Sequence, residues 1–303
     1  MRVRRRVTAI FGAVLLLLLS SLAAAGTATA APKFTRYVAL GDSYTAGPLI
    51  PMQRLDPLGC FRSTRNYPAQ LARQLDVKSY TDVSCSGADT SHLSRPQEVT
   101  LGVNPPQFDA LRPNTDLVTI GIGGNDESVF GRLVGTCPQL RASDPAGSPC
   151  QEHFTVDGVD TLDEAIARTG ERVAAVLDGV HARSPRATVL VIGYPRIAPP
   201  SGTCPGILPF ADGDYAWLNS IEEALNDALA KAVADDGRAV FVDLYPASLG
   251  HDACAGTDAW IQGKDTNPLG AASYHPRFSG MAGVATEIFE QLRASRAGLP
   301  AGR

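Results

Sequence analysis

The stretch Asp116-Leu117-Val118-Thr119-Ile120-Gly121-Ile122, followed directly by Gly123-Gly124, has the pattern of a central β-strand. It is a continuous apolar and β-branched run rather than an alternation of apolar and polar residues, and the two glycines mark its end. A continuous run of this kind is typical of a strand that is buried on both faces of a parallel sheet. This stretch therefore indicates a covered parallel sheet.

Similar short runs and helical patterns alternate on both sides of this stretch. The strand-like runs are residues 37–40, 80–84, 187–192 and 239–243. The helical patterns are residues 67–75, 162–181 and 215–234, and we expect a last helix to begin with Ser279 as its N-cap. Strands that alternate with helices predict an α/β fold with helices on both faces of the sheet.

The chain shows no internal repeat and no charged or Ser/Gly-rich linker, so we expect one domain over residues 31–303. Two segments interrupt the alternation. Residues 126–160 are predicted to be rich in loops, and residues 194–212 carry five prolines. Long irregular loops in a compact domain are usually functional or tied down.

The first 30 residues have the pattern of a secretory signal peptide. Four arginines precede an apolar run from Val7 to Leu19, and Ala28-Thr29-Ala30 supplies small residues for cleavage. A membrane anchor is the alternative, but the run is shorter than the span of about 20 apolar residues that a bilayer requires. We therefore expect a secreted, extracellular protein that is cleaved after Ala30. Cleavage removes four arginines and no acid, which changes the formal net charge from −4 to −8.

Composition excludes several classes of protein. With 44% hydrophobic residues and a modest charge, disorder is not expected, and an acidic balance argues against a nucleic-acid binder. Export would place the six cysteines in an oxidising compartment, where disulfides persist. Metal ligation is the competing interpretation, but no close CxxC pair with a matching ligand set is present. Three disulfides are expected, and the sequence alone allows about 15 connectivities.

Polar and glycine residues follow three of the predicted strands, where parallel α/β sheets bind their ligands. Ser43 follows the first strand, Gly87 the second and Asn125 the third. A serine activated by a base can act as a nucleophile in acyl transfer, and the oxyanion then needs preorganised donors. The amide N–H groups of Ser43 and Gly87 and the side chain of Asn125 would supply three. The neighbouring Asp42 and Asp126 are expected to order the loops.

These residues resemble the successive sequence blocks of the GDSL esterases and lipases, also called SGNH hydrolases. The blocks are Gly41-Asp42-Ser43-Tyr44, Gly87, Gly124-Asn125-Asp126 and His275-Pro276. The resemblance implies a three-layer α/β/α sandwich with a flavodoxin-like parallel sheet. It also implies a serine ester hydrolase, and disulfides that pair Cys60 with Cys85, Cys137 with Cys150 and Cys204 with Cys254, as in secreted bacterial lipases of this family.

The general base must be one of five histidines: His92, His153, His181, His251 and His275. His181 lies late in a predicted helix and is expected to be solvated there, complementing the helix dipole. His251 lies close to Cys254 and is open to a structural role. The residues alone leave the choice open, and the match to the His-Pro block of the family selects His275.

The group that orients His275 departs from the common pattern. Many relatives place an Asp three residues before the histidine, but this position is Ala272. Some members of the family use a main-chain carbonyl instead, and that of Ser273 is the natural candidate. A carbonyl can fix the Nδ1–H tautomer, although it stabilises an imidazolium less than a carboxylate does. Asp258 and Asp265 remain alternatives.

Several motifs of other enzymes are absent from the sequence, which has no G-x-S-x-G, P-loop or H-E-x-x-H. No cofactor or metal is expected. The expected substrate is a small-molecule or lipid ester, with transient contact to a lipid interface, and the chain is expected to be a monomer. Residues 49–52 and 207–210 are candidate walls for an acyl chain. The alternatives are an extracellular carbohydrate O-acetyl esterase and a non-catalytic binding module.

Overall fold

The structure, a computed structural model, describes residues 33–297. The expected leader, residues 1–30, lies outside the described residues. None of the helices in the described range is long and apolar enough to cross a membrane.

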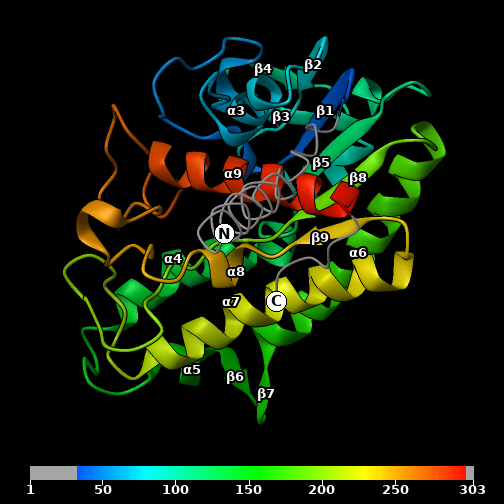
Figure 1. Cartoon of the computed structure of the whole chain (residues 1–303). Coiled ribbons are helices and arrows are strands. Elements are labelled where there is room, and N and C mark those ends of the chain that lie inside the picture. The colour runs from blue at the N-terminus through cyan, green and yellow to red at the C-terminus, as the bar shows by residue number, and fades with distance from the viewer. Residues whose placement is uncertain (1–32, 298–303) are drawn as a thin grey trace, which may run out of the picture.

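A five-stranded parallel sheet forms the centre of the molecule (Figure 1). Its strands are β1 (Arg36–Gly41), β2 (Ser79–Asp82), β5 (Leu117–Gly121), β8 (Thr188–Ile192) and β9 (Val240–Val242). They are arranged in the order β2-β1-β5-β8-β9, which is the flavodoxin-like order. The predicted fold class is therefore confirmed. The order reverses between β1 and β5, and ligands of such sheets bind beyond the carboxyl ends of the strands at this point.

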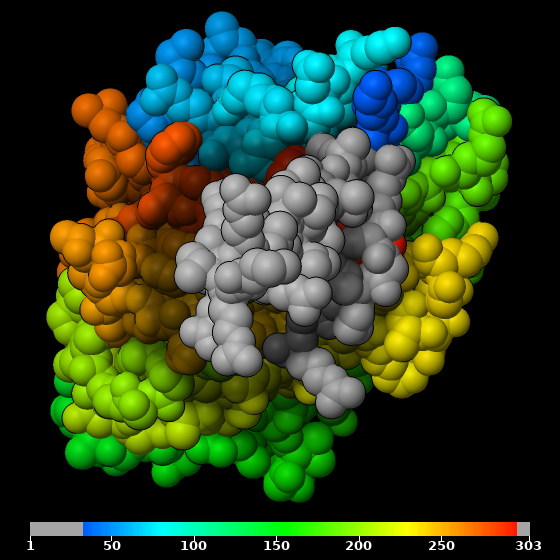
Figure 2. Space-filling view, viewed as in Figure 1, coloured from blue at the N-terminus to red at the C-terminus, as the bar shows by residue number. Residues whose placement is uncertain are grey.

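Two layers of helices cover the sheet. Successive strand residues point to opposite faces, and both faces of the sheet carry apolar side chains that the helices bury. Val38 and Leu40 of β1 face a layer made by α6 (Thr161–Arg183) and α7 (Asp214–Asp236). Tyr37 and Ala39 face α3 (Tyr67–Gln74) and α9 (Phe278–Ala297). Figure 1 shows these two layers on either side of the sheet. In the space-filling view, the blue-to-cyan first part of the chain lies along the top and the green-to-yellow part along the bottom (Figure 2).

Short elements complete the chain. The remaining helices are α2 (Ser43–Ala46), α4 (Val129–Leu140), α5 (Pro149–Phe154) and α8 (Leu244–Ala247). Two antiparallel hairpins are formed by β3 (Gln97–Val99) with β4 (Gly102–Asn104) and by β6 (Thr155–Val156) with β7 (Val159–Asp160). Segment 194–212 contains no helix or strand, as predicted.

Segment 126–160 differs from its prediction as a loop-rich region, because it contains α4, α5 and a hairpin. Val129, Leu133 and Cys137 of α4 are spaced by four residues and form one buried face. Glycines at 131 and 135 and Pro138 inside the helix conceal this pattern, since they are poor helix formers. The final helix also differs, because it begins at Phe278 and Ser279 lies in its first turn. There the Ser279 hydroxyl donates to the Ala259 carbonyl.

Candidate active site

The turn from β1 into α2 presents Ser43. Gly41 at the end of β1 has φ +155°, and a Cβ there would lie 2.2 Å from Thr45 Oγ1. Asp42 caps α2, since its carboxylate accepts a hydrogen bond of 2.8 Å from the Tyr44 amide. Asp42 therefore orders the turn, as the sequence suggests. The first residue of α2 is Ser43, whose residue surface is only 6% exposed.

Ser43, Gly87, Asn125 and His275 line one open cavity of about 370 Å³. They come from four segments that are distant in the sequence. Among the described residues, no protein acceptor is bonded to the amide N–H of Ser43 or of Gly87. The Asn125 side-chain amide donates to the Ala88 carbonyl at 2.9 Å, and its second N–H is left for another acceptor. The cavity thus holds three donors beside one serine.

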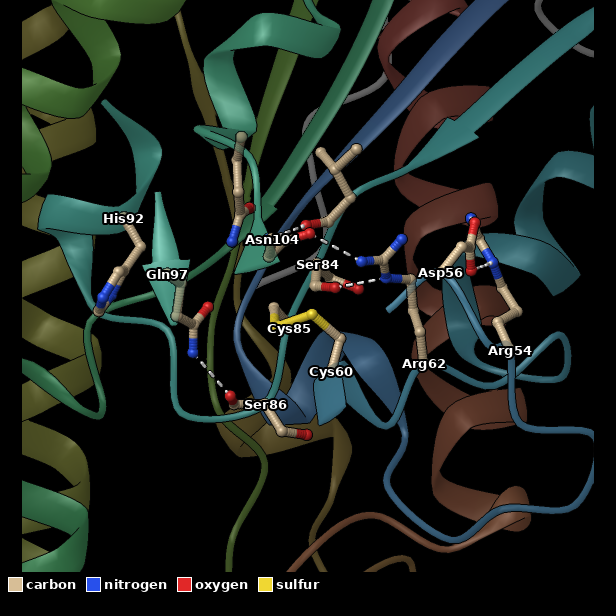
Figure 3. The surroundings of a disulfide bond; sticks show 12 residues. Arg54, Asp56, Cys60, Arg62, Ser84, Cys85, Ser86, His92, Gln97 and Asn104 are labelled. Carbon is tan, nitrogen blue, oxygen red and sulfur yellow. Dashed lines mark hydrogen bonds and ion pairs between the residues drawn. A yellow bond between two sulfur atoms is a disulfide. The ribbon is translucent and has the colours of Figure 1, made fainter. Parts of the chain in front are cut away.

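The oxyanion loop, which we define as residues 83–88, is held by a buried guanidinium. Arg62 donates to the carbonyls of Ser84 (2.5 Å) and Asp82 (2.9 Å) and to the Asn104 side chain (3.0 Å). Arg62 is 2% exposed, so these bonds lie out of contact with solvent. Figure 3 shows Arg62 reaching the carbonyl of Ser84 beside the Cys60–Cys85 disulfide.

A disulfide and two further hydrogen bonds hold Cys85 and Ser86 of the oxyanion loop. Cys60 is joined to Cys85 by a disulfide, and the Cys60 carbonyl accepts from the Ser86 amide at 3.0 Å. The Gln97 side chain donates to the Ser86 carbonyl at 2.9 Å (Figure 3). The loop that carries Gly87 is therefore fixed before any substrate binds. The other two disulfides join Cys137 to Cys150 and Cys204 to Cys254, so all three pairs are those that the resemblance implies.

The histidine loop, which we define as residues 272–276, carries His275. The Nδ1 atom lies 2.7 Å from the Ser273 carbonyl oxygen. Because the acceptor is a carbonyl, Nδ1 carries the proton and Nε2 is left unprotonated. Burial lowers the pKa of His275 from its usual value, and the Ser273 carbonyl opposes this effect. The imidazole is accordingly neutral at pH 7.

Neither alternative carboxylate is the hydrogen-bond partner of His275 Nδ1, which is the Ser273 carbonyl. The Asp265 carboxylate pairs with Lys264 at 2.7 Å. Asp258 is exposed, and its main-chain carbonyl lies 2.7 Å from the His251 ring. Asp126 accepts from the amide and hydroxyl of Thr90 and pairs with Arg172, so it ties the segment that follows Asn125.

The other four histidines do not line this cavity. His92 Nδ1 accepts from the Asp89 amide in a capping box. His251 stacks on Trp260, with ring centroids 4.8 Å apart. His153 lies in α5 and packs edge-on against Phe154. His181 is buried and its Nε2 lies 3.1 Å from Asp236, so the expectation that it is solvated is wrong. The fold of α6 against the end of α7 buries it.

Sequence reasoning missed a second cavity next to Ser43, which is narrower and less open than the first. It shares Ser43, Asn125 and Phe130 with the open cavity and continues between α4 and α7. Its walls are mostly apolar, but Glu222 and Asp42 also line it. Desolvation raises the pKa of Glu222 to about 8 and that of Asp42 to about 7. The sequence feature that could have indicated this cavity is the apolar face of α4.

Only some of the residues expected to line an acyl-chain site, 49–52 and 207–210, lie at the open cavity. Leu49 lines the open cavity. Leu208 and Phe210 are instead buried in a core cluster with α7, because Tyr215 holds the Leu208 carbonyl at 2.7 Å. Among the described residues, no group of three or more His, Cys, Asp or Glu side chains has the arrangement of a metal site.

Comparison with known proteins agrees with this geometry. A model of the GDSL-like lipase/acylhydrolase family matches residues 39–282. Lipase 2 of Streptomyces coelicolor is 40% identical over 266 residues, covering 86% of this chain and 87% of that protein. An esterase of Streptomyces scabiei is 38% identical, covering 79% of this chain and 77% of that protein.

A solved structure has the same fold. The crystal structure of phospholipase A1 from Streptomyces albidoflavus NA297 is 29% identical, with a TM-score of 0.70, and covers 85% of this chain and 99% of that one. The extracellular lipase of Streptomyces rimosus is also 29% identical, with a TM-score of 0.68, and covers 84% and 99%. The chain therefore belongs to the GDSL-like lipase/acylhydrolase family, and it is an ester hydrolase of the lipase and esterase type.

Proposed function

We propose that Ser43 is the nucleophile of this hydrolase and His275 its general base. The observation that carries the proposal is the convergence of Ser43, Gly87, Asn125 and His275 on one cavity. His275 Nε2 takes the proton as Ser43 Oγ attacks the ester carbonyl. His275 then returns that proton to the leaving alcohol, which leaves an acyl-enzyme that water hydrolyses by the reverse sequence.

The oxyanion of each tetrahedral intermediate is stabilised by three donors. They are the amide N–H groups of Ser43 and Gly87 and the second side-chain N–H of Asn125. Donors that are held in place cost little reorganisation when the negative charge develops, which makes them effective in catalysis. The bonds of the oxyanion loop to Arg62 and Gln97 support this assignment.

The imidazolium that forms during the reaction has a neutral orienting partner. The Ser273 carbonyl fixes the tautomer of His275 at 2.7 Å. A carbonyl lacks the charge of a carboxylate, so the site acts as a serine–histidine dyad with main-chain support.

We further propose a lipid ester as the substrate of a secreted, monomeric enzyme. Leu49 and Phe61 line the open cavity, and the segment between them exposes Met52 (64%) and Leu55 (79%). Exposed apolar side chains beside a cavity suit transient contact with a lipid surface. The three disulfides and the names of the similar Streptomyces proteins support secretion and a lipid substrate.

Hydrolysis of p-nitrophenyl esters from C2 to C18, with a phospholipid and a triacylglycerol alongside, tests this function. Ser43→Ala and His275→Ala should each abolish turnover while the variants keep the wild-type circular dichroism spectrum. Turnover that survives Ser43→Ala would contradict the proposed nucleophile. Activity confined to C2 esters would contradict the lipid substrate.

A further inference from the structure

The peptide group between Tyr274 and His275 is held at both of its polar atoms. Its N–H, on His275, donates to the Ala272 carbonyl at 3.2 Å. Its carbonyl oxygen, on Tyr274, accepts a hydrogen bond of 2.6 Å from the Tyr44 hydroxyl. Tyr274 has φ +59°, a left-handed conformation that non-glycine residues rarely adopt. The segment that presents His275 is thus held by one bond within the histidine loop and by one from Tyr44, outside it.

The ring of Tyr44 also contacts the imidazole directly. The two ring centroids lie 5.5 Å apart with an interplanar angle of 43°. Phe130 packs against the same imidazole at 5.5 Å, with an angle of 73°. Tyr44 and Phe130 in turn meet edge to face at 5.9 Å. The imidazole therefore lies among aromatic rings that restrict its rotation toward other rotamers.

Tyr44 is itself anchored to the turn that carries Ser43. Its amide donates to Asp42, and its ring packs on Tyr194 at 5.2 Å. The Tyr194 hydroxyl bonds the Asp42 carboxylate and accepts from the Gly124 amide at 2.9 Å. Burial raises the pKa of Tyr44 well above its usual value, so its hydroxyl keeps the proton that it donates. One side chain thus connects the Ser43 turn to the histidine loop.

No carboxylate is bonded to His275 Nδ1 to orient the imidazole. The residue three positions before His275 is Ala272, and the Nδ1 partner is a neutral carbonyl. A carboxylate at Nδ1 would orient the ring and stabilise its charge together. With a carbonyl there, the orientation of the ring depends on how firmly the loop itself is held.

From these contacts we infer that Tyr44 is a positioning residue for His275. Its hydroxyl holds the Tyr274 carbonyl, and its ring limits the imidazole to the rotamer in which Nδ1 faces Ser273. The inference rests on the proposed function for the role of His275 in catalysis. The structural part, that Tyr44 keeps His275 in the orientation in which the Ser273 carbonyl fixes its tautomer, can be measured without any substrate.

Tyr44→Phe tests the hydroxyl while keeping the ring. We expect kcat to fall by roughly three- to tenfold, the factor that one ordinary hydrogen bond provides, with KM changed by less than about twofold. Tyr44→Leu, which also removes the ring, should lower kcat further. A purely structural loss would reduce the fraction of folded enzyme, so kcat is expressed per active site titrated with a phosphonate ester.

The second measurement is the ¹⁵N spectrum of the His275 imidazole in the free protein. Wild type should show the Nδ1–H tautomer, and Tyr44→Phe should show a mixture of tautomers. This result separates the inference from the proposed function. If His275→Ala keeps full activity, the proposed function is wrong, and the spectra of Tyr44→Phe still decide whether Tyr44 positions the ring.

Tyr215→Phe is the matched control. The Tyr215 hydroxyl also donates to a loop carbonyl, that of Leu208, at 2.7 Å, but in the proline-rich segment. This variant should lower the melting temperature while leaving kcat and the His275 spectrum unchanged. The inference would be overturned if Tyr44→Phe kept the wild-type tautomer, or if Tyr215→Phe lowered kcat per active site by the same factor.

Discussion

The oxyanion loop and the histidine loop are held in different ways. The oxyanion loop is joined to its neighbour by the Cys60–Cys85 disulfide, and the buried Arg62 bonds the carbonyls at its start. The histidine loop contains no cysteine, so no disulfide crosslinks it to the rest of the site. It is held by main-chain hydrogen bonds to Gln262 and by the Tyr44 hydroxyl.

This difference follows from what each loop has to do. The donors of an oxyanion hole stabilise charge best when they do not move, so rigid fixation of Gly87 suits the oxyanion role that we propose for it. A general base must carry a proton from the nucleophile to the leaving group, which needs an orientation but tolerates small displacements. The comparison predicts that the two loops respond differently to substitution, reduction and pH.

The largest effect is expected from Asn125→Ala, which acts on the oxyanion side. The variant loses one oxyanion donor and the bond to the Ala88 carbonyl. We expect kcat to fall by about 10² to 10³, or about 2.7–4 kcal/mol of transition-state stabilisation. Steady-state kinetics on a p-nitrophenyl ester measure the loss. An unchanged kcat would remove Asn125 from the oxyanion hole.

Removal of the Cys60–Cys85 disulfide tests whether covalent fixation matters for catalysis. The double variant Cys60→Ala/Cys85→Ala should lose about 3 kcal/mol in the free energy of unfolding, because the crosslink restricts the unfolded chain. Its kcat should also fall, since Gly87 follows Cys85 by two residues. Chemical denaturation and kinetics give the two values.

The matched control is Cys137→Ala/Cys150→Ala, which removes a disulfide from α4 and α5. It should lose stability to a similar degree and keep its kcat at temperatures where it is folded. Equal loss of kcat in both double variants would show that the oxyanion loop has no special dependence on its disulfide.

Protonation of the His275 imidazole is expected to have a smaller effect. Because burial lowers the pKa of His275, the native protein resists protonation that the unfolded chain accepts at pH 6.5. The native imidazole therefore stays neutral somewhat below pH 6.5. The free energy of unfolding decreases only as the pH falls below that value, because the unfolded chain then binds a proton that the native protein does not. An NMR titration of the His275 ring should give a midpoint below 6.5. The titration follows His275 itself, whereas a pH–rate profile would also include any titration of Asp42, whose pKa burial raises to about 7.

The smallest effect is expected at Asp258 and Asp265, the two carboxylates that precede the histidine loop in the sequence. Asp258→Asn and Asp265→Asn should each leave kcat nearly intact, because Nδ1 of His275 is bonded to Ser273. A loss of about a thousandfold in either variant would indicate a true Ser–His–Asp triad. The same kinetic assay on both variants decides between the two arrangements.

The sheet and the segments that meet at Ser43 could be predicted from the sequence. Residues 116–122 and the similar runs mark strands because burial on both faces leaves no alternation, and parallel strands bring their ends to one edge. The resemblance to the GDSL family added His275 and the pairing of the cysteines. These features depend on local pattern and on a short motif at each strand end.

Features that depend on packing between distant segments could not be predicted. The pairing of His181 with Asp236 arises where α6 meets the end of α7. The helix α4 was hidden by Gly131, Gly135 and Pro138, and with it the narrower cavity beside Ser43. The contact of Tyr44 with Tyr274 spans 230 residues of sequence, and nothing in the local pattern of either residue indicates it.

The most direct test of the catalytic site is covalent labelling with a long-chain p-nitrophenyl phosphonate, followed by mass spectrometry of the digested protein. A phosphonate adduct resembles the tetrahedral intermediate and forms only on an activated nucleophile. We predict a single adduct on Ser43, formed much more slowly in Asn125→Ala and absent in His275→Ala. An adduct on another residue, or labelling of Ser43 at the wild-type rate in His275→Ala, would contradict the account.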